Sequence, residues 1–222
     1  MANKVYIIGS GGHAKVVIDS IEAEGQWQIA GLIDDYRAIG ETTLSYKIIG
    51  GLAALKQIAC QQTPINLIVA VGDNCSRSKI VTLIEKQALR VNFISVVHPK
   101  ASVSQHATIA PGCVVMANAS IAPAAQIGAH AIVNHNASVD HDCKLANFCS
   151  VSPGATLCGN VQLGQLSAIG AGATVIEKTT IGENCVIAAN SVVINKIESN
   201  QVAIGCPAVA RKTRKHGETY LK

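Results

Sequence analysis

Two histidines, a carboxylate and a glycine are spaced in a way that could support acyl transfer. His135 and His141 lie six residues apart, Asp142 follows directly, and Gly159 comes eighteen residues after His141. If the chain repeats every eighteen residues, Gly159 stacks on His141, and an imidazole meets an unobstructed backbone N–H. An imidazole with a pKa near 6.5 can take a proton from an attacking amine, and the N–H can stabilise the oxyanion. The spacing therefore predicts a site for attack on a thioester.

A second set of residues is suited to binding a nucleotide. Residues 9–14 read Gly-Ser-Gly-Gly-His-Ala and join an apolar segment to a helix-like one, where the backbone can approach a phosphate at a helix N-terminus. Two further polar groups end the next apolar segments, and the carboxyl ends of parallel strands share one edge of a sheet. The predicted contacts are Ser10, Gly11, Gly12, His13, Asp34, Asp35, Gly72 and Asn74.

Two kinds of repeating structure must position these residues. In residues 1–96, strand-like segments alternate with helix-like ones, which predicts an α/β domain with a Rossmann-like parallel sheet. The expected strands are 5–8, 28–33, 65–71 and 91–96, and the expected helices are 14–24, 52–60 and 78–89.

From residue 97 the period changes to six. Seventeen aliphatic residues occupy every sixth position from Val97 to Val193, and a column of small or β-branched residues lies four positions later. This is the period of the hexapeptide β-helix, in which three hexads close one triangular coil and residues eighteen apart stack. The prism is too narrow for aromatic rings. Its flat sides need neighbours, so we expect an oligomer, most simply a homotrimer.

The composition agrees with this architecture and excludes other classes. Of 222 residues, 14% are charged, 3% aromatic and 49% hydrophobic, which excludes a disordered chain. No apolar stretch reaches about 18 residues, so no membrane span is expected, and a net charge of +4 gives no case for nucleic acid. Without an export signal, we expect a cytoplasmic chain whose eight cysteines are reduced. Four of them, Cys113, Cys143, Cys149 and Cys185, fall in the small column and are explained by packing.

The motifs resemble those of a known family. Residues 7–13 (IIGSGGH), 32–35 (LIDD), 69–74 (VAVGDN), 133–142 and 202–208 (VAIGCPA) are similar to those of bacterial sugar acyltransferases of the sialic acid O-acetyltransferase-like hexapeptide-repeat family. Within that family the resemblance is nearest to the N-acetyltransferases of UDP-4-amino-sugars in bacillosamine biosynthesis. It implies a left-handed parallel β-helix, a trimer and acetyl-CoA bound between adjacent prisms.

The resemblance also implies roles for individual residues. The family has a His–Glu pair as general base, and this chain has His141 and Asp142, whose carboxylate is one methylene shorter. Asn134 matches an Asn near the acceptor amine, whereas Ser150 stands where the family has a His that contacts acetyl-CoA. The aspartate pair matches contacts to uracil and ribose. The implied acetyl-CoA contacts are Ser150, Gly159, Ala171 and Ala189, and no metal is expected.

The predicted function is acetyl-CoA-dependent N-acetylation of a nucleotide-linked 4-amino-4,6-dideoxy sugar, UDP-linked in preference, for glycan precursor synthesis. The domains would be a nucleotide-sugar-binding domain (1–96), an acyltransferase β-helix (97–210) and a basic, frayed tail (211–222). His135 is expected to be structural, and His106 and His130 to be solvated on the prism surface.

Three alternatives stay open on the residues alone. The chain could O-acetylate sialic acid or a related sugar. It could be a zinc-dependent β-helix hydratase with His106, His135 and His141 as ligands, although their hexad phases differ. It could also be a non-catalytic nucleotide-binding scaffold.

Overall fold

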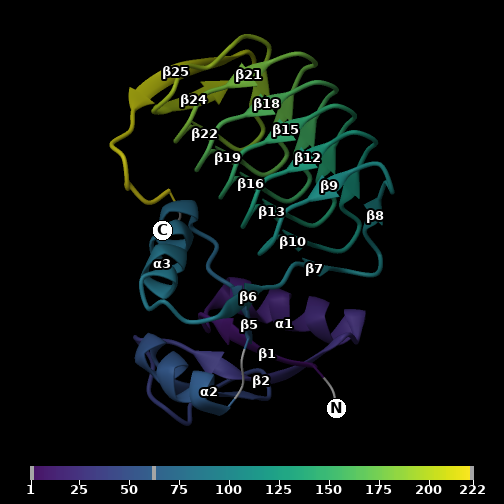
Figure 1. Ribbon diagram of the computed structural model, residues 1–222. Coiled ribbons are helices and arrows are strands. Elements are labelled where there is room, and N and C mark those ends of the chain that lie inside the picture. Colours follow the sequence, from purple (N-terminus) through teal and green to yellow (C-terminus); the bar gives the residue numbers. More distant parts are fainter. Residues whose placement is uncertain (1–2, 62–63, 221–222) are drawn as a thin grey trace.

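The chain folds into an α/β domain with a stack of triangular coils upon it (Figure 1). The computed structural model describes residues 3–61 and 64–220. The predicted fold class, a Rossmann-like domain followed by a left-handed parallel β-helix, is confirmed. In the described part of the chain, no helix combines the length and apolar character that crossing a membrane requires.

The N-terminal domain contains a six-stranded sheet with the order β3-β4-β2-β1-β5-β6. All neighbouring strands are parallel except the β3–β4 hairpin, which the sequence analysis missed. The strands are β1 (Asn3–Ile8), β2 (Trp27–Ile33), β3 (Thr42–Thr43), β4 (Tyr46–Gly50), β5 (Ile65–Val69) and β6 (Val91–Phe93). The strand expected at 91–96 is divided, because residues 96–97 already belong to the first coil of the prism.

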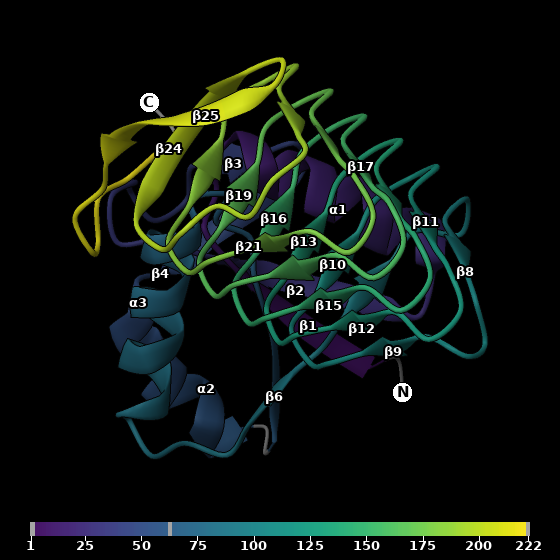
Figure 2. The same cartoon turned by 90° about the horizontal axis from the view of Figure 1, so that it is seen from above.

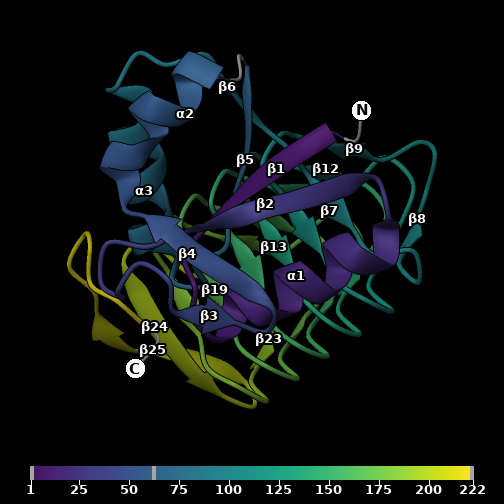
Figure 3. The ribbon, with the colours of Figure 1, turned by 90° about the horizontal axis from the view of Figure 1, so that it is seen from below.

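Helix α1 (Gly12–Glu24) lies between this sheet and the prism (Figures 1 and 3). Its buried residues include Ala14, Val17, Ile18 and Ile21, the spacing of one apolar helix face, and they join a core with residues of both domains. The remaining helices are η1 (Leu52–Ala54), α2 (Leu55–Gln61) and α3 (Asn74–Glu85).

Helix α3 begins four residues earlier than predicted. The side chain of Asp73 accepts a hydrogen bond from the Ser76 N–H at 2.8 Å, which is an N-cap. The expected strand at 65–71 correspondingly ends at Val69, and residues 70–73 form the connection.

Seventeen two-residue strands form the coils, one for each predicted hexad. They are β7 (Val96–Val97), β8 (Ser102–Val103), β9 (Thr108–Ile109), β10 (Val114–Val115), β11 (Ser120–Ile121), β12 (Gln126–Ile127), β13 (Ile132–Val133), β14 (Ser138–Val139), β15 (Lys144–Leu145), β16 (Ser150–Val151), β17 (Thr156–Leu157), β18 (Gln162–Leu163), β19 (Ala168–Ile169), β20 (Thr174–Val175), β21 (Thr180–Ile181), β22 (Val186–Ile187) and β23 (Val192–Val193). Residues eighteen apart pair in parallel, as Val115, Val133 and Val151 do. Both predicted columns point inward and form one core.

The three edges of the prism are defined by residues that stack across successive turns. The first edge contains His135, Pro153, Ala171 and Ala189, and the Gly154 N–H donates to the His135 carbonyl. The second edge contains Pro123, His141, Gly159 and Glu177, and the third contains Ala129, Asn147, Gln165 and Glu183. Backbone hydrogen bonds of 2.8–3.2 Å join the successive turns on each of these two edges.

The tail is ordered, which corrects the prediction of a frayed C-terminus. Strand β24 (Gln201–Gly205) continues the β22 sheet, and β25 (Ala208–Thr213) pairs antiparallel with it at the end of the stack (Figure 2). The expected boundary at residue 211 therefore falls inside a strand. Beyond it, Arg214 is buried and its backbone N–H donates to Asn200 O at 2.8 Å.

The guanidinium of Arg77 joins the two domains. Arg77 is 1% exposed, and its Nε donates to the His130 carbonyl at 2.8 Å. Its Nη1 donates to the carbonyls of Val71 and Gly72, and its Nη2 donates to Asn74 Oδ1 at 2.6 Å. Residues of the β5–α3 connection and of the prism thus share one cation.

His130 lies in this interface and not on a solvated surface, so its predicted exposure was wrong. It is 6% exposed, stacks on Phe148 with ring centroids 5.0 Å apart, and meets the edge of Phe93 at 4.8 Å. Burial, with the charge of Arg77, lowers the pKa of His130 to about 4. His130 is therefore neutral at pH 7.

The width of the prism can be tested by placing a ring in it. Val151→Phe should lower the free energy of unfolding by roughly 1–3 kcal/mol, because the Val151 side chain is fully buried and the extra atoms strain the coil. Urea or thermal unfolding measures the change. Gln162→Phe is the control, since Gln162 is exposed on β18 and points out of the prism. Equal stability of both variants would contradict a narrow interior.

The burial of His130 should make stability depend on pH. Its pKa is about 4 in the folded chain and near 6.5 in an unfolded one, so between these values the unfolded state binds more protons. Its contribution, up to about 3 kcal/mol, is complete above pH 6.5 and is lost as the pH falls towards 4.

Unfolding curves of His130→Asn between pH 4 and 7 should show a shallower pH dependence than the wild type, even though loss of the stacked ring lowers stability overall. The matched control is His106→Asn, because His106 is exposed. An unchanged slope in His130→Asn would show that its titration does not contribute.

Candidate active site

His141 lies on the second edge with its ring directed over Gly159. Its Nδ1 lies 2.8 Å from Asp142 Oδ2, so the shorter aspartate still reaches the imidazole. A Cβ atom added to Gly159 would come within 2.6 Å of His141 Nε2, and the Asn160 N–H donates to the His141 carbonyl. The spacing of eighteen thus brings the predicted residues together, and only glycine leaves room for the ring.

The remaining polar atoms of this group are free to act on a ligand. With Nδ1 held by Asp142, Nε2 is the ring nitrogen left to take a proton. The Gly159 N–H makes no hydrogen bond within the described residues. About half of the His141 side chain is exposed, at 55%. The arrangement can therefore provide a base and a backbone donor at an accessible edge.

Asp140 is a member of this group that the sequence analysis missed. Its Oδ1 accepts a hydrogen bond from the His141 backbone N–H at 2.7 Å. The hydrogen bond to Asp142, followed by the charge of Asp140, raises the pKa of His141 above 6.5. Asp140 precedes the histidine in the sequence, so a carboxylate on each side of His141 was the clue available.

Two of the predicted nucleotide contacts, Asp34 and Asp35, line a slot at the carboxyl ends of the sheet strands. The slot has a volume of about 140 Å³, with apolar walls and with Asp34 and Asp35 among its lining residues. Gly9 and Val71, from the loops after β1 and β5, also line it. This shape and polarity suit a flat base with N–H groups that can donate to a carboxylate.

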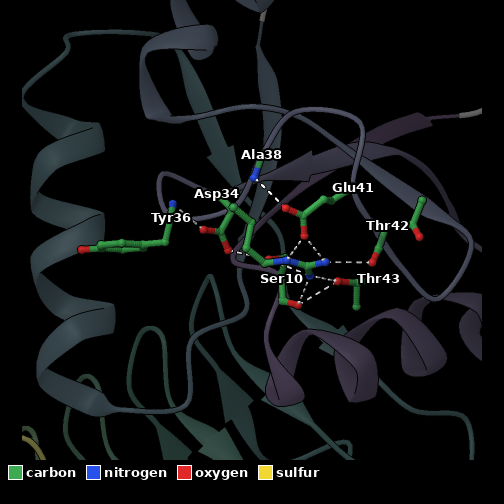
Figure 4. A network of polar contacts seen from close by, with 8 residues as sticks. Ser10, Asp34, Tyr36, Ala38, Glu41, Thr42 and Thr43 are labelled. Carbon is green, nitrogen blue, oxygen red and sulfur yellow. Dashed lines mark hydrogen bonds and ion pairs between the residues drawn. The ribbon is translucent and has the colours of Figure 1, made fainter.

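Both aspartates are also held by the protein. Asp34 accepts from Ser10 Oγ at 2.6 Å and from the Tyr36 N–H at 2.9 Å (Figure 4). Asp35 Oδ1 accepts from the Leu52 N–H at 2.9 Å. These bonds fix the direction of each carboxylate before a ligand arrives. Preorganisation of this kind reduces the entropy lost on binding.

Arg37 is a second residue that the sequence analysis missed. Its guanidinium donates to Thr43 Oγ1 at 2.7 Å, to Ser10 O at 3.3 Å and to Glu41 at 2.9 Å. It therefore ties the glycine loop to the β3–β4 hairpin. No motif indicated this role, because the hairpin itself had not been predicted.

The glycines of the loop differ in what they require. Gly9 has φ +100°, which favours glycine for backbone reasons alone. Gly11 and Gly12 are exposed, have no positive φ, and a Cβ at either would meet nothing within 4 Å. The fold therefore does not demand glycine at these two positions, which favours a ligand that approaches the backbone.

A second pocket, of about 310 Å³, lies between the two domains. It is lined from the N-terminal domain by Gly12, His13 and Gly72 and from the prism by Asn134 and Ser150. The His13 Nε2 is shielded from solvent and has no hydrogen-bond partner in the described chain. Burial, followed by the charges of Arg77 and His135, lowers the pKa of His13 to about 4. A neutral ring with an unpaired nitrogen thus faces this region.

Asn74 does not belong to the binding surface, which corrects its predicted role. It is 1% exposed, its Oδ1 accepts from Arg77, and its Nδ2 donates to Ser150 Oγ and to the carbonyls of Leu166 and Ser167. All of its side-chain polar atoms are therefore used between the domains.

The predicted acetyl-CoA contacts lie on more than one part of the prism. Gly159 is on the second edge with His141, whereas Ala171 and Ala189 stack over His135 on the first edge. Ser150 is buried beside Asn74 and lines the interdomain pocket. One chain therefore does not gather all of these positions, nor does it bring His141 to either pocket.

The histidines named for a zinc site do not converge within one chain. Among residues 3–61 and 64–220, no three His, Cys, Asp or Glu side chains are grouped so as to hold a metal ion. His135 instead pairs with its neighbour, its Nδ1 lying 3.1 Å from Asn134 Oδ1.

Comparison with known proteins identifies the family. Residues 4–84 match the PglD N-terminal domain, and residues 160–195 match the bacterial transferase hexapeptide (six repeats). PerB from Caulobacter crescentus, in complex with CoA and GDP-perosamine, is 35% identical with a TM-score of 0.88, over 96% of this chain and 99% of that one. This chain belongs to the PglD-type hexapeptide-repeat acetyltransferases.

Two further members of the PglD-type family are similar. The acetyltransferase domain of PglB from Neisseria gonorrhoeae FA1090, in complex with acetyl coenzyme A, is 34% identical with a TM-score of 0.86, over 95% of this chain and all of that one. UDP-N-acetylbacillosamine N-acetyltransferase of Bacillus subtilis (strain 168) is 35% identical over 114 residues. That match spans about half of each protein, 51% in both cases.

The raised pKa of this PglD-type histidine can be measured directly. In Asp142→Asn the pKa of His141 should fall towards 6.5, because the hydrogen bond that favours the imidazolium is weakened. Asp140→Asn should lower it less, since Asp140 acts through its charge. NMR titration of the His141 ring gives both values. A pKa of His141 that is unchanged in Asp142→Asn would contradict the pairing.

Proposed function

We propose that this protein transfers the acetyl group of acetyl-CoA to the amino group of a nucleotide-linked 4-amino-4,6-dideoxy sugar. The observation that carries this proposal is the His141–Asp142 pair, whose ring lies over the backbone of Gly159. PerB and the PglB domain, which bind CoA and acetyl-CoA respectively, support the identity of the donor.

The proposed step is a direct attack of the amine on the thioester carbonyl. His141 Nε2 accepts the proton that the amine loses as the C–N bond forms, while Asp142 holds Nδ1 and stabilises the imidazolium. The Gly159 N–H donates to the oxyanion. When the C–S bond breaks, the proton passes from His141 to the CoA thiolate, so the base is regenerated. No acyl-enzyme is required.

Two chains would be needed to assemble this site. His141 and Gly159 lie on the second edge, whereas Asn134 and the interdomain pocket lie beside the first edge with Ala171 and Ala189. In a homotrimer of parallel prisms, the first edge of one chain can face the second edge of the next. The crevice between them would bind acetyl-CoA through the backbone of these small residues, and His141 would meet the acceptor held by its neighbour.

UDP is the preferred nucleotide in this proposal. Asp34 and Asp35 line the slot and can accept from the N–H groups of a base, and the resemblance of the motifs to UDP-4-amino-sugar acetyltransferases favours uracil. The relatives differ in this respect, since one is named for a UDP-sugar and another was crystallised with GDP-perosamine. We place the reaction in the cytoplasm, a reducing compartment, because all eight cysteines are free thiols.

The proposal is tested by acetyl transfer from acetyl-CoA to UDP- and GDP-linked 4-amino sugars, with free sialic acid as a third acceptor. We expect N-acetylation of the UDP-linked sugar and a fall in kcat of roughly 10²–10⁴-fold in His141→Ala, the size expected for loss of a general base.

His106→Ala is the matched control, because His106 is exposed and should leave turnover unchanged. Full turnover in His141→Ala would remove its assigned role. Acetylation of sialic acid alone would replace the N-acetyltransferase with an O-acetyltransferase.

A further inference from the structure

The segment after β25 returns along the third edge to the N-terminal domain. We call residues 214–220 the C-terminal strap. Arg214 N donates to Asn200 O at 2.8 Å, and Asn184 Nδ2 donates to Lys215 O at 3.2 Å, so the strap is fixed to the prism. Its last described residues lie beside the start of α3 (Figure 1).

Tyr220 ends the strap and touches both domains. Its backbone N–H donates to Asp73 Oδ2 at 3.2 Å, and its hydroxyl lies 3.3 Å from Gly72 O and 2.8 Å from Ser150 Oγ. Gly72 and Ser150 belong to opposite walls of the interdomain pocket, and Tyr220 itself lines that pocket. The phenol therefore closes the gap between the walls.

The surrounding hydrogen bonds favour one direction for the protons of this chain of contacts. Arg77 donates to Asn74 Oδ1, so the Asn74 amide must present Nδ2 to Ser150 Oγ. Ser150 can then donate to Tyr220, whose own proton is directed towards the Gly72 carbonyl. Burial raises the pKa of Tyr220, so the phenol is protonated at neutral pH. Its oxygen keeps one lone pair for a donor in the pocket.

The nucleotide slot and the interdomain pocket lie on the same two loops. Gly9 and Val71 line the slot, whereas Gly12, three residues after Gly9, and Gly72, directly after Val71, line the pocket. A molecule with its base in the slot and its phosphates along the glycine loop would place its next group in the pocket. That group would lie beside His13 and Tyr220, which both line the pocket.

We propose that Tyr220 is a binding residue for the sugar ring of the nucleotide-linked acceptor, delivered to the interdomain pocket by the C-terminal strap. This inference rests on the proposed function. The polar side chains that line this pocket are uncharged, as Asn134, Ser150 and Tyr220 are, which suits the hydroxyl and amino groups of a sugar. The slot differs, because carboxylates are among its lining residues. Tyr220 should therefore distinguish a nucleotide sugar from the free nucleoside diphosphate.

Calorimetry should compare UDP with a UDP-linked 4-amino sugar, and the GDP pair if it binds more tightly. In Tyr220→Phe, which keeps the ring, we expect the Kd and KM of the nucleotide sugar to rise roughly 3- to 10-fold, the value of one hydrogen bond. The Kd of the free nucleoside diphosphate should change less than about 2-fold. Tyr220→Ala should weaken sugar binding further.

Tyr46→Phe is the matched control, because Tyr46 also loses one phenol hydrogen bond, to Glu22 at 2.8 Å, away from both pockets. Three results would overturn the proposal. The affinity for the nucleotide sugar could be unchanged in Tyr220→Phe, or Tyr220→Phe could bind the free nucleotide and the nucleotide sugar equally more weakly and have a lower Tm. The wild type could also bind the free nucleotide and the nucleotide sugar with equal affinity. Sugar binding that depends on Tyr220 without acetyl transfer would refute the proposed function and leave this inference standing.

Discussion

A buried cation, the guanidinium of Arg77, determines how the two domains meet. No carboxylate contacts it within the described residues, and backbone carbonyls and Asn74 Oδ1 accept its hydrogen bonds. Burial lowers its pKa to about 10, so it stays charged at neutral pH. A buried charge of this kind is stable only when every donor finds an acceptor. The acceptors come from both domains, and the loop after β5 therefore has one position relative to the prism.

That position has consequences throughout the site. The Val71 and Gly72 carbonyls that bind Arg77 belong to residues of the two pockets, so both pockets are held in register with the prism. The same cation orients Asn74, and through it Ser150 and Tyr220. It also lowers the pKa of His13 and His130 in addition to the effect of burial. The rings of His13 and His130, near the domain boundary, are thus neutral at pH 7.

The prism could be predicted from the sequence because its rule is local. An aliphatic or a small residue is required at each inward position, and these positions recur every six residues. The stacking of Gly159 on His141 follows from their separation of eighteen residues, which is one full coil. The parts that were missed depend on contacts between distant segments. His130 is buried because the rings of Phe93 and Phe148 pack against it. The Asn74 side chain is oriented by the hydrogen bond that it accepts from Arg77. Tyr220 is held in place by its hydrogen bonds to Asp73 and Ser150. The six-residue repeat does not relate Phe93, Arg77 or Asp73 to the residue that each contacts, so the sequence pattern could not predict these contacts.

The triangular coil also limits how such a protein can change in length. Each edge is visited once in eighteen residues, and His141 lies on a different edge from His135, Ala171 and Ala189. Loss or gain of a single hexad between residues 141 and 159 would turn every later residue onto the next edge and separate His141 from Gly159. Only a whole coil can be added or removed without rotating the surface. The length of the prism, and with it the length of any crevice between prisms, should therefore evolve in steps of one complete coil.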